Sequence, residues 1–294
     1  MKDDIGVSNS FSVLLNIAGL GLSIKSSVPF RCFKDFSFYE KFIVNEFPEI
    51  SCFLTHRIGV PNLYLNTATE TFTTQNWLLQ TTTDKKILIV GPQQKNKLVD
   101  NVAVFNSDYS QGILYQKHIY EIFRRFIDQF LFINILSRRK GFLFHASGVI
   151  YQNKGLCFAG VSGSGKSTLL SLWRREVPED ALLNDDRVAL RRIKRRWLIF
   201  GTPWYGESKV ATNKSARLNT IFFIRHADKT FLKPISVNQA LAKLGVLALL
   251  PLWDKSSVKQ VLSSFEMLVK EVPMYEFGFR PDKTAVETIK ELLC

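Results

Sequence analysis

The chain has 294 residues, of which 46% are hydrophobic, and this is enough apolar material for one large globular domain or two ordinary ones. Its longest apolar stretches, residues 130–133 and 245–250, fall far short of the roughly 20 residues that a bilayer-spanning helix needs, which argues against a membrane protein. The formal charge of +13 is uneven, with 16 basic and 12 acidic residues up to Lys140 and 23 and 14 beyond it, and such an excess favours anionic ligands without choosing among nucleotides, acidic peptides and nucleic acid.

The first residues predict a strand rather than a signal peptide. Asp3 and Asp4 follow the start, and the next apolar stretch is interrupted by Asn16 and Gly19. The four cysteines show no paired spacing, which favours reduced thiols over a metal site. We therefore expect a cytoplasmic protein.

Residues 1–110 predict a strand-rich α+β region. Short apolar runs at residues 11–15, 20–24 and 86–90 are bounded by Gly, Pro and Asn and are typical of strands. Residues 35–47 carry apolar side chains at helical spacing and could form a helix.

Residues 111–140 predict a long connecting helix. Apolar side chains recur at helical spacing from residue 111 to residue 137. Core packing is favoured over a lipid-facing or partner-facing surface, because any buried helix shows such a stripe. The stripe consists of Ile119, Phe123, Phe126, Ile127, Phe130 and Ile133.

Residues 141–294 alternate strand and helix patterns and predict an α/β nucleotide-binding domain. Strands are expected at residues 142–151, 154–159, 181–183, 188–193, 197–201 and 220–225, and a helix at 166–175. Ser236 and Gln239 form a capping-box pair, and further helices are expected after Trp253 and after Pro281.

A glycine-rich sequence between a predicted strand and a predicted helix matches the P-loop pattern at every fixed position. In such a loop the glycines let backbone N–H groups converge on phosphate, the lysine reaches the β- and γ-phosphates, and the serine ligates Mg²⁺. We therefore expect ATP and Mg²⁺ as ligands. The predicted nucleotide-binding residues are Gly160, Ser162, Gly163, Ser164, Gly165, Lys166, Ser167 and Thr168.

Two adjacent carboxylates, Asp185 and Asp186, follow the strand that comes one helix after Lys166. Such a pair can divide its work, one accepting a proton and the other holding Mg²⁺. A solvated turn is the alternative. Signatures of other P-loop classes are missing, since there is no LSGGQ-like stretch and residues 213–216 lack the aspartate of a guanine-reading NKxD motif.

His145 lies fifteen positions before Gly160, on the strand expected to pair with the one that enters the loop. This spacing, the loop and residues 184–188 together resemble the catalytic domain of HPr kinase/phosphorylase, whose fold is related to phosphoenolpyruvate carboxykinase. The resemblance covers about residues 141–225 and implies a P-loop core of this type. It also implies that Asp185 is the catalytic base, that His145 is its partner and that Asp186 serves Mg²⁺.

Glu207 lies in the loop that follows the predicted strand at residues 197–201 and is a further candidate Mg²⁺ ligand, with an exposed loop acid as the alternative. The family's arginine–glycine signature has no counterpart between Arg191 and Arg225. The acceptor thus stays open among a protein, a peptide and a small hydroxyl compound. The resemblance also implies a homo-oligomer and suggests a hexamer.

Six basic residues lie in a predicted hairpin beside the carboxylate pair, and a solvated hairpin is favoured over a clamp for an acidic substrate or nucleic acid. The basic residues are Arg187, Arg191, Arg192, Lys194, Arg195 and Arg196.

The leading hypothesis for the function is a kinase that phosphorylates a serine-type hydroxyl, with Asp185, His145 and Lys166 as catalytic residues. A nucleotide-binding regulatory module or slow ATPase is the alternative.

Overall fold

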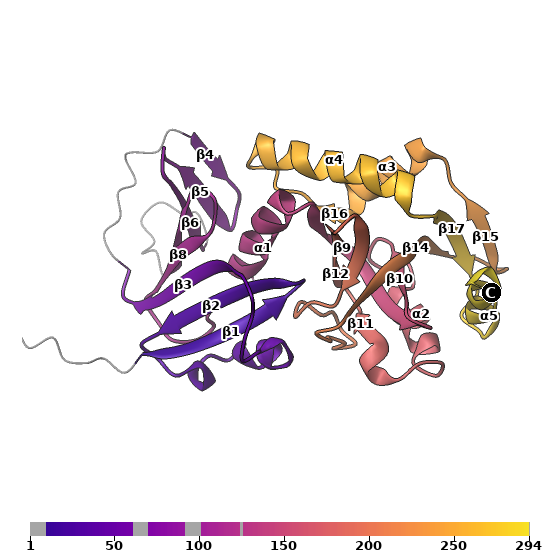
Figure 1. The fold of residues 1–294 in the computed structure, drawn as a ribbon, viewed down its shortest axis with the longest axis horizontal. Coiled ribbons are helices and arrows are strands. Elements are labelled where there is room, and N and C mark those ends of the chain that lie inside the picture. The colour runs from indigo at the N-terminus through magenta and orange to yellow at the C-terminus, as the bar shows by residue number, and fades with distance from the viewer. Residues whose placement is uncertain (1–9, 61–69, 92–100, 124–125, 294) are drawn as a thin grey trace, which may run out of the picture. The chain divides into compact units, whose positions relative to one another are not determined.

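The computed structural model describes residues 10–60, 70–91, 101–123 and 126–293 (Figure 1). The chain divides into two compact units, one made of residues 1–16 and 20–131 and the other of residues 17–19 and 132–294. Each unit contains a mixed sheet and helical segments, which confirms the α/β class. The predicted boundaries at residues 110 and 140 stay a prediction. No helix within the described ranges is long and apolar enough to cross a membrane.

The described part of the first unit is built on an eight-stranded sheet with the order β1-β2-β3-β8-β7-β6-β5-β4. Strand β3 runs parallel to both β2 and β8, and the pairs from β8 through β4 are antiparallel. The predicted strands at residues 11–15, 20–24 and 86–90 are confirmed. The bounds are β1 Phe11–Ile17, β2 Leu20–Ser26, β3 Ile50–Ile58, β4 Glu70–Thr73, β5 Trp77–Thr81, β6 Lys85–Val90, β7 Asn101–Asn106 and β8 Gln111–Gln116.

The predicted long helix is wrong over its first half. Residues Gln111–Gln116 form strand β8, and helix α1 spans only Ile127–Arg138. Pairing with β3 on one side and β7 on the other outweighs the weak helical periodicity of this segment. The helix expected at residues 35–47 is a 3₁₀ helix, η2 Phe36–Phe42, preceded by the short η1 Phe30–Cys32.

A buried carboxylate, Asp35, organises the chain before helix α1. It is 1% exposed and accepts the backbone N–H groups of Ile122 and Phe123 at 2.8 and 3.1 Å. Burial raises the pKa of Asp35 to about 6, although the two N–H groups act to lower it. Burial therefore destabilises the ionised carboxylate of Asp35, and the two hydrogen bonds offset this effect only in part.

Asp35 makes the protein more stable at mildly acidic pH than near neutrality. Because its pKa is higher in the folded chain than the ordinary 3.8, its favourable contribution is fully present below about pH 4 and is lost as the pH rises through 6. The loss is at most about 3 kcal/mol. Urea unfolding between pH 4 and 7 should show wild type losing stability relative to Asp35→Asn as the pH rises, and parallel curves for the two proteins would contradict this.

The described part of the second unit is built on a nine-stranded mixed sheet whose main path is β10-β9-β12-β13-β14-β17-β15. Strands β11 and β16 pair with β9, and β10 also pairs in parallel with β14. The strands predicted in this region are confirmed with shifts of at most one residue, except that β14 begins at Ser215 and not at residue 220. Strands β15, β16 and β17 had no counterpart among the predicted strands. The bounds are β9 Gly141–Tyr151, β10 Lys154–Ala159, β11 Leu182–Asn184, β12 Arg187–Ile193, β13 Arg196–Phe200, β14 Ser215–His226, β15 Phe231–Pro234, β16 Ala248–Leu249 and β17 Met274–Phe279.

Two cores cover the two faces of this sheet. Helices α3 Val237–Leu247 and α4 Lys255–Glu271 bury Leu244 and Phe265 against one face, where Phe265 packs on Phe142 with the ring centroids 4.9 Å apart. Helices α2 Lys166–Trp173 and α5 Thr284–Leu293 bury Trp173 and Ile289 in the other core. The predicted capping box of Ser236 and Gln239 begins α3. The short 3₁₀ helix η3 Glu179–Ala181 precedes β11.

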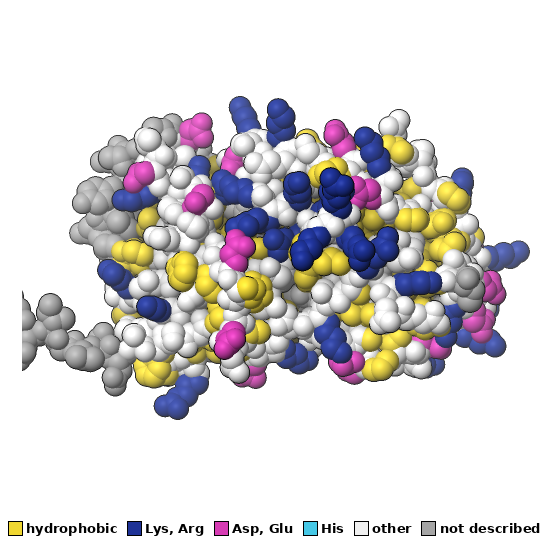
Figure 2. Space-filling model, viewed as in Figure 1, with side chains coloured by type: hydrophobic (Ala, Val, Ile, Leu, Met, Phe, Trp, Pro, Cys, Tyr) yellow, Lys and Arg dark blue, Asp and Glu magenta, His cyan; other side chains and the backbone are white. Residues whose placement is uncertain are grey.

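The basic residues of the β12–β13 hairpin are partly engaged within the second unit. Arg192 forms a two-point contact with Glu271 at 2.9 and 2.6 Å, and Arg191 donates to the carbonyl of Gly19 at 2.9 Å. Lys194 and Arg195 form the exposed left-handed turn. Figure 2 shows Lys and Arg side chains gathered over the region of β9, β12 and α4. The contacts of Arg191 and Arg192 support the fold of the hairpin, and the choice between a solvated hairpin and a clamp stays a prediction.

Candidate functional site

The glycine-rich loop, residues 160–165, joins the end of β10 to the start of α2. Gly165 is the N-cap of α2 with φ of +98°, and Gly163 has φ of +79°, conformations that residues with a Cβ adopt only with strain. Gly160 needs glycine for another reason, since a Cβ there would lie 2.3 Å from Oγ of Ser164. The loop can therefore curl only because these positions carry no side chain.

Lys166 stabilises the curled loop through hydrogen bonds to its backbone. Its side chain is nearly buried, and Nζ donates to the carbonyl oxygens of Gly160 at 2.8 Å and Val161 at 3.1 Å. Burial lowers the pKa of Lys166, while the nearby carboxylates of Asp186 and Asp185 act to raise it. The lysine thus places a positive charge at the mouth of the loop beside the N-terminus of α2.

A polar pocket of about 440 Å³ opens over the loop and the start of α2. Its walls come from five chain segments that are separated in sequence: β9, the loop with α2, the turn after β11, the loop after β13, and the end of β14. Two predicted residues, Gly160 and Ser164, are not among its lining residues. The lining consists of His145, Ser162, Gly163, Gly165, Lys166, Ser167, Thr168, Asp185, Asp186, Gly206, Glu207 and His226.

The topology explains why these residues meet. Strand β14 runs parallel to β10, so the carboxyl ends of both strands reach the same edge of the sheet. His145 on β9 lies opposite Arg187 on the antiparallel β12, immediately after the two carboxylates. The polar groups therefore collect where the parallel strands end, the usual position of ligand sites in α/β sheets.

Asn184 and Asp185 fix the turn that carries the carboxylates. The side-chain oxygen of Asn184 accepts the backbone N–H groups of Asp186 and Arg187, both at 2.7 Å. Asp185 is 2% exposed, and its two oxygens accept the N–H groups of Gly206 at 2.9 Å and Ser208 at 2.7 Å. Asp185 therefore ties the loop that carries Glu207 to the end of β11.

His145 pairs with Asp186 and not with Asp185, so the predicted partnership is corrected. Nε2 of His145 lies 2.9 Å from Oδ1 of Asp186. The pKa of Asp186 is lowered, first by this hydrogen bond and further by the charges of Arg187 and Lys166. The backbone N–H groups of the loop at 206–208 have already taken up Asp185, which leaves Asp186 facing the histidine.

His226 is a pocket residue that the sequence interpretation missed. It ends β14 and packs against Phe279 with the rings tilted and their centroids 5.5 Å apart. It also lies so close to Gly165 that a Cβ on this glycine would be 3.0 Å from the imidazole ring. The strand expected at residues 220–225 offered a signal, because the residue after a parallel strand often faces a site.

No protein-family model and no curated protein matches this chain. Among solved structures, it is similar to the HPr(Ser) kinase/phosphatase from Coxiella burnetii, with 13% identity over 51% of this chain and 87% of that chain. The TM-score is 0.27, a weak likeness that carries no weight for activity.

The two left-handed glycines of the loop should respond differently to an added methyl group. Gly163→Ala should lower the free energy of unfolding by about 1–2 kcal/mol, the cost of a left-handed residue with a Cβ, because its surroundings are open. Gly165→Ala should cost more, since the new Cβ would also lie 2.7 Å from the ring of Phe279. Urea denaturation measures both, and equal losses would show that the contacts of Gly165 do not constrain the loop.

Proposed function

We propose that this protein is an ATP-dependent phosphotransferase of the HPr-kinase type, which moves the γ-phosphoryl group to a serine-type hydroxyl. The observation that supports it most is that the glycine-rich loop with Lys166 and the pair of His145 and Asp186 line one polar pocket. A phosphate site and a proton acceptor within one pocket are the two parts that such a transfer requires.

The nucleotide phosphates would take the place of the loop carbonyls around Lys166. Its ammonium group is within reach of two neutral carbonyl oxygens, and a phosphate is the stronger acceptor because it is charged. The N–H groups of the loop and the N-terminus of α2 would add further donors. In this proposal Gly160, Ser162, Gly163, Ser164, Gly165, Ser167 and Thr168 complete the cradle.

Magnesium fits the oxygen donors of the pocket. Ser167, Asp186 and Glu207 line it, and Mg²⁺ is commonly held by one or two carboxylates together with substrate phosphates and water. Within the described residues no group of three or more His, Cys, Asp or Glu side chains is gathered as a metal cage. When bound, the ion would neutralise charge on the phosphates. Ser167, Asp186 and Glu207 are therefore the proposed ligands.

The proton of the acceptor hydroxyl would pass to His145. Since Nε2 of His145 faces the carboxylate of Asp186, its N–H points there and the lone pair belongs to Nδ1. This is the logic by which a carboxylate orients a histidine base. The bond between the γ-phosphorus and the β,γ-bridging oxygen breaks, a bond to the acceptor oxygen forms, and ADP and a phosphoester leave. Asp185, which the resemblance implied as the base, would instead position the loop of Glu207.

A nucleotide-binding module or slow ATPase is a second candidate. The engagement of both Asp185 oxygens by backbone N–H groups favours it, since this carboxylate supports a loop and is not poised beside an acceptor. Water would then replace the hydroxyl substrate in the same pocket. The two candidates differ in the acceptor of the γ-phosphoryl group, which is a hydroxyl compound for the kinase and water for the ATPase.

Transfer of label from [γ-³²P]ATP to a library of serine-containing peptides, with Mg²⁺, tests the proposal. His145→Gln should lower transfer about 10²-fold or more, the usual contribution of a general base, while changing ADP affinity by less than about twofold. Lys166→Ala should weaken ADP binding about tenfold or more through loss of charge-assisted contacts.

His118→Gln is the matched control, since His118 is exposed in the first unit, and it should behave as wild type. Release of all label as inorganic phosphate, with none on peptide, would reject the kinase in favour of the ATPase. Unchanged transfer by His145→Gln would reject the assignment of the base.

A further inference from the structure

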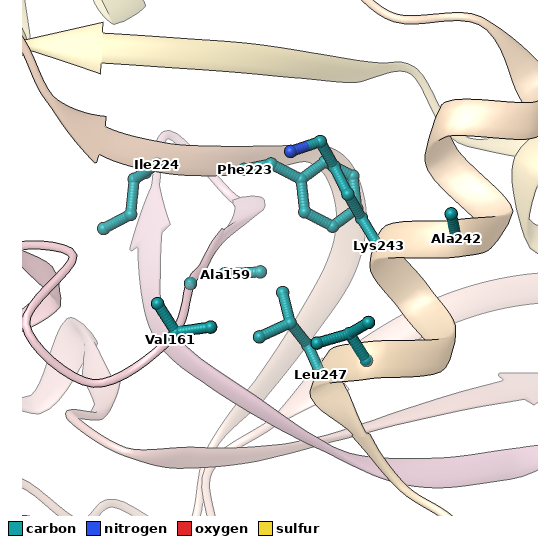
Figure 3. Close-up of a pocket in the computed structure, with 9 residues that line it drawn as sticks. Ala159, Val161, Phe223, Ile224, Ala242, Lys243 and Leu247 are labelled. Carbon is teal, nitrogen blue, oxygen red and sulfur yellow. The ribbon is translucent and has the colours of Figure 1, made fainter.

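A second pocket lies next to the glycine-rich loop and shares no lining residue with the polar pocket. It has a volume of about 300 Å³ and is bounded by the first loop residues, the end of β14 and one side of α3 (Figure 3). Along the loop, the last residue that lines this second pocket is Val161 and the first that lines the polar pocket is Ser162. The two pockets therefore adjoin at the peptide between these residues. The lining consists of Ala159, Gly160, Val161, Phe223, Ile224, Ala242, Lys243, Val246 and Leu247.

The walls of this pocket are apolar and incompletely covered. Val161 is 57% exposed and Val246 is 73% exposed, although both line a concave surface beside buried Leu247. In Figure 3 Val161 and Leu247 face the same space from opposite walls. Apolar surface that is left exposed within a concavity is typical of ligand sites, and the volume is at the lower end of their usual range.

Lys243 supplies the only charge of the pocket lining. Its Nζ lies over the ring of Phe223, 5.6 Å from the centroid, at the side of the cavity (Figure 3). No carboxylate of the described residues lies within ion-pair distance of it. A half-buried ammonium that contacts only an aromatic face has its hydrogen-bonding capacity open towards a ligand.

The pocket is poorly suited to a nucleotide base. Gly160 and Val161 line it, but their carbonyl oxygens already accept hydrogen bonds from Lys166, which belongs to the polar pocket. A base that entered would bury ring nitrogens and an amino group with few partners, and each unpaired group would cost free energy. An apolar group meets no such penalty.

We propose that this pocket binds an organic acid: an aliphatic or aromatic group enters between α3 and the loop, and its carboxylate or phosphate pairs with Lys243. The site is separate from the proposed phosphotransfer chemistry. Its apolar walls supply burial, and the lysine supplies the preference for an anion.

Isothermal titration calorimetry of the full chain with 4-phenylbutyrate, 4-phenylbutylamine and adenosine tests this proposal. The acid should bind, and the amine, which has the same apolar group and the opposite charge, should bind at least about fivefold more weakly. Lys243→Gln should weaken the acid by about fivefold and leave the amine no weaker. Ala242→Trp should abolish binding of the acid by filling the pocket from the exposed side of α3.

Lys259→Gln on α4 and Val237→Trp at the start of α3 are the matched controls, both exposed and outside the pocket lining, and should bind the acid as wild type does. Circular dichroism establishes that Ala242→Trp is folded, and Lys243→Gln provides the test if it is not. The proposal is overturned if the acid fails to bind at roughly 10 mM, if the amine binds equally well, or if Lys243→Gln has no effect. Adenosine binding that Ala242→Trp abolishes would assign the pocket to a base and would also overturn it.

Discussion

The curl of the glycine-rich loop is the constraint on which the candidate site depends. Strand β10 must end, turn and become helix α2 within a few residues, and it does so through two left-handed glycines and through Gly160, where any side chain would meet Ser164. Lys166 closes the turn by binding two of its carbonyl oxygens. The same curl brings the N-terminus of α2 and the ammonium group of Lys166 together, and the proposed phosphate site depends on this arrangement.

The hydrogen bonds of the turn after β11 determine which carboxylate faces His145 beside the glycine-rich loop. The side-chain oxygens of Asn184 and Asp185 accept hydrogen bonds from backbone N–H groups, and both residues therefore stabilise loops. Asp186 is left facing His145, and this pairing gives the histidine a defined tautomer. Asp185 thus holds a loop of the pocket while Asp186 orients His145, and this difference depends on which backbone groups lie close to each carboxylate.

Local signals in the sequence predicted much of the second unit. The glycine spacing of the loop, the capping box at Ser236 and the alternating strands depend on residues close in sequence, and the structure has these elements with small shifts at their ends. Strand β8 was mistaken for helix because its identity depends on pairing with β3 and β7. The partner of His145 depends on long-range packing in the same way and leaves no local trace, whereas His226 has only the indirect signal that it follows a predicted strand.

The apolar pocket and the polar pocket occupy opposite ends of one short loop segment. Lys166 binds the carbonyls of Gly160 and Val161, and these two residues line the apolar pocket. A ligand on either side therefore contacts a wall that belongs to the loop. This arrangement follows from the position of α3 beside the end of β14.

A crystal structure with Mg²⁺ and a non-hydrolysable ATP analogue tests the central claim most directly. The account predicts that Nζ of Lys166 leaves the carbonyls of Gly160 and Val161 to bind the β- and γ-phosphates, with the γ-phosphate facing His145 and Asp186. Phosphates bound elsewhere, or a Lys166 that keeps both carbonyl contacts beside bound nucleotide, would contradict it.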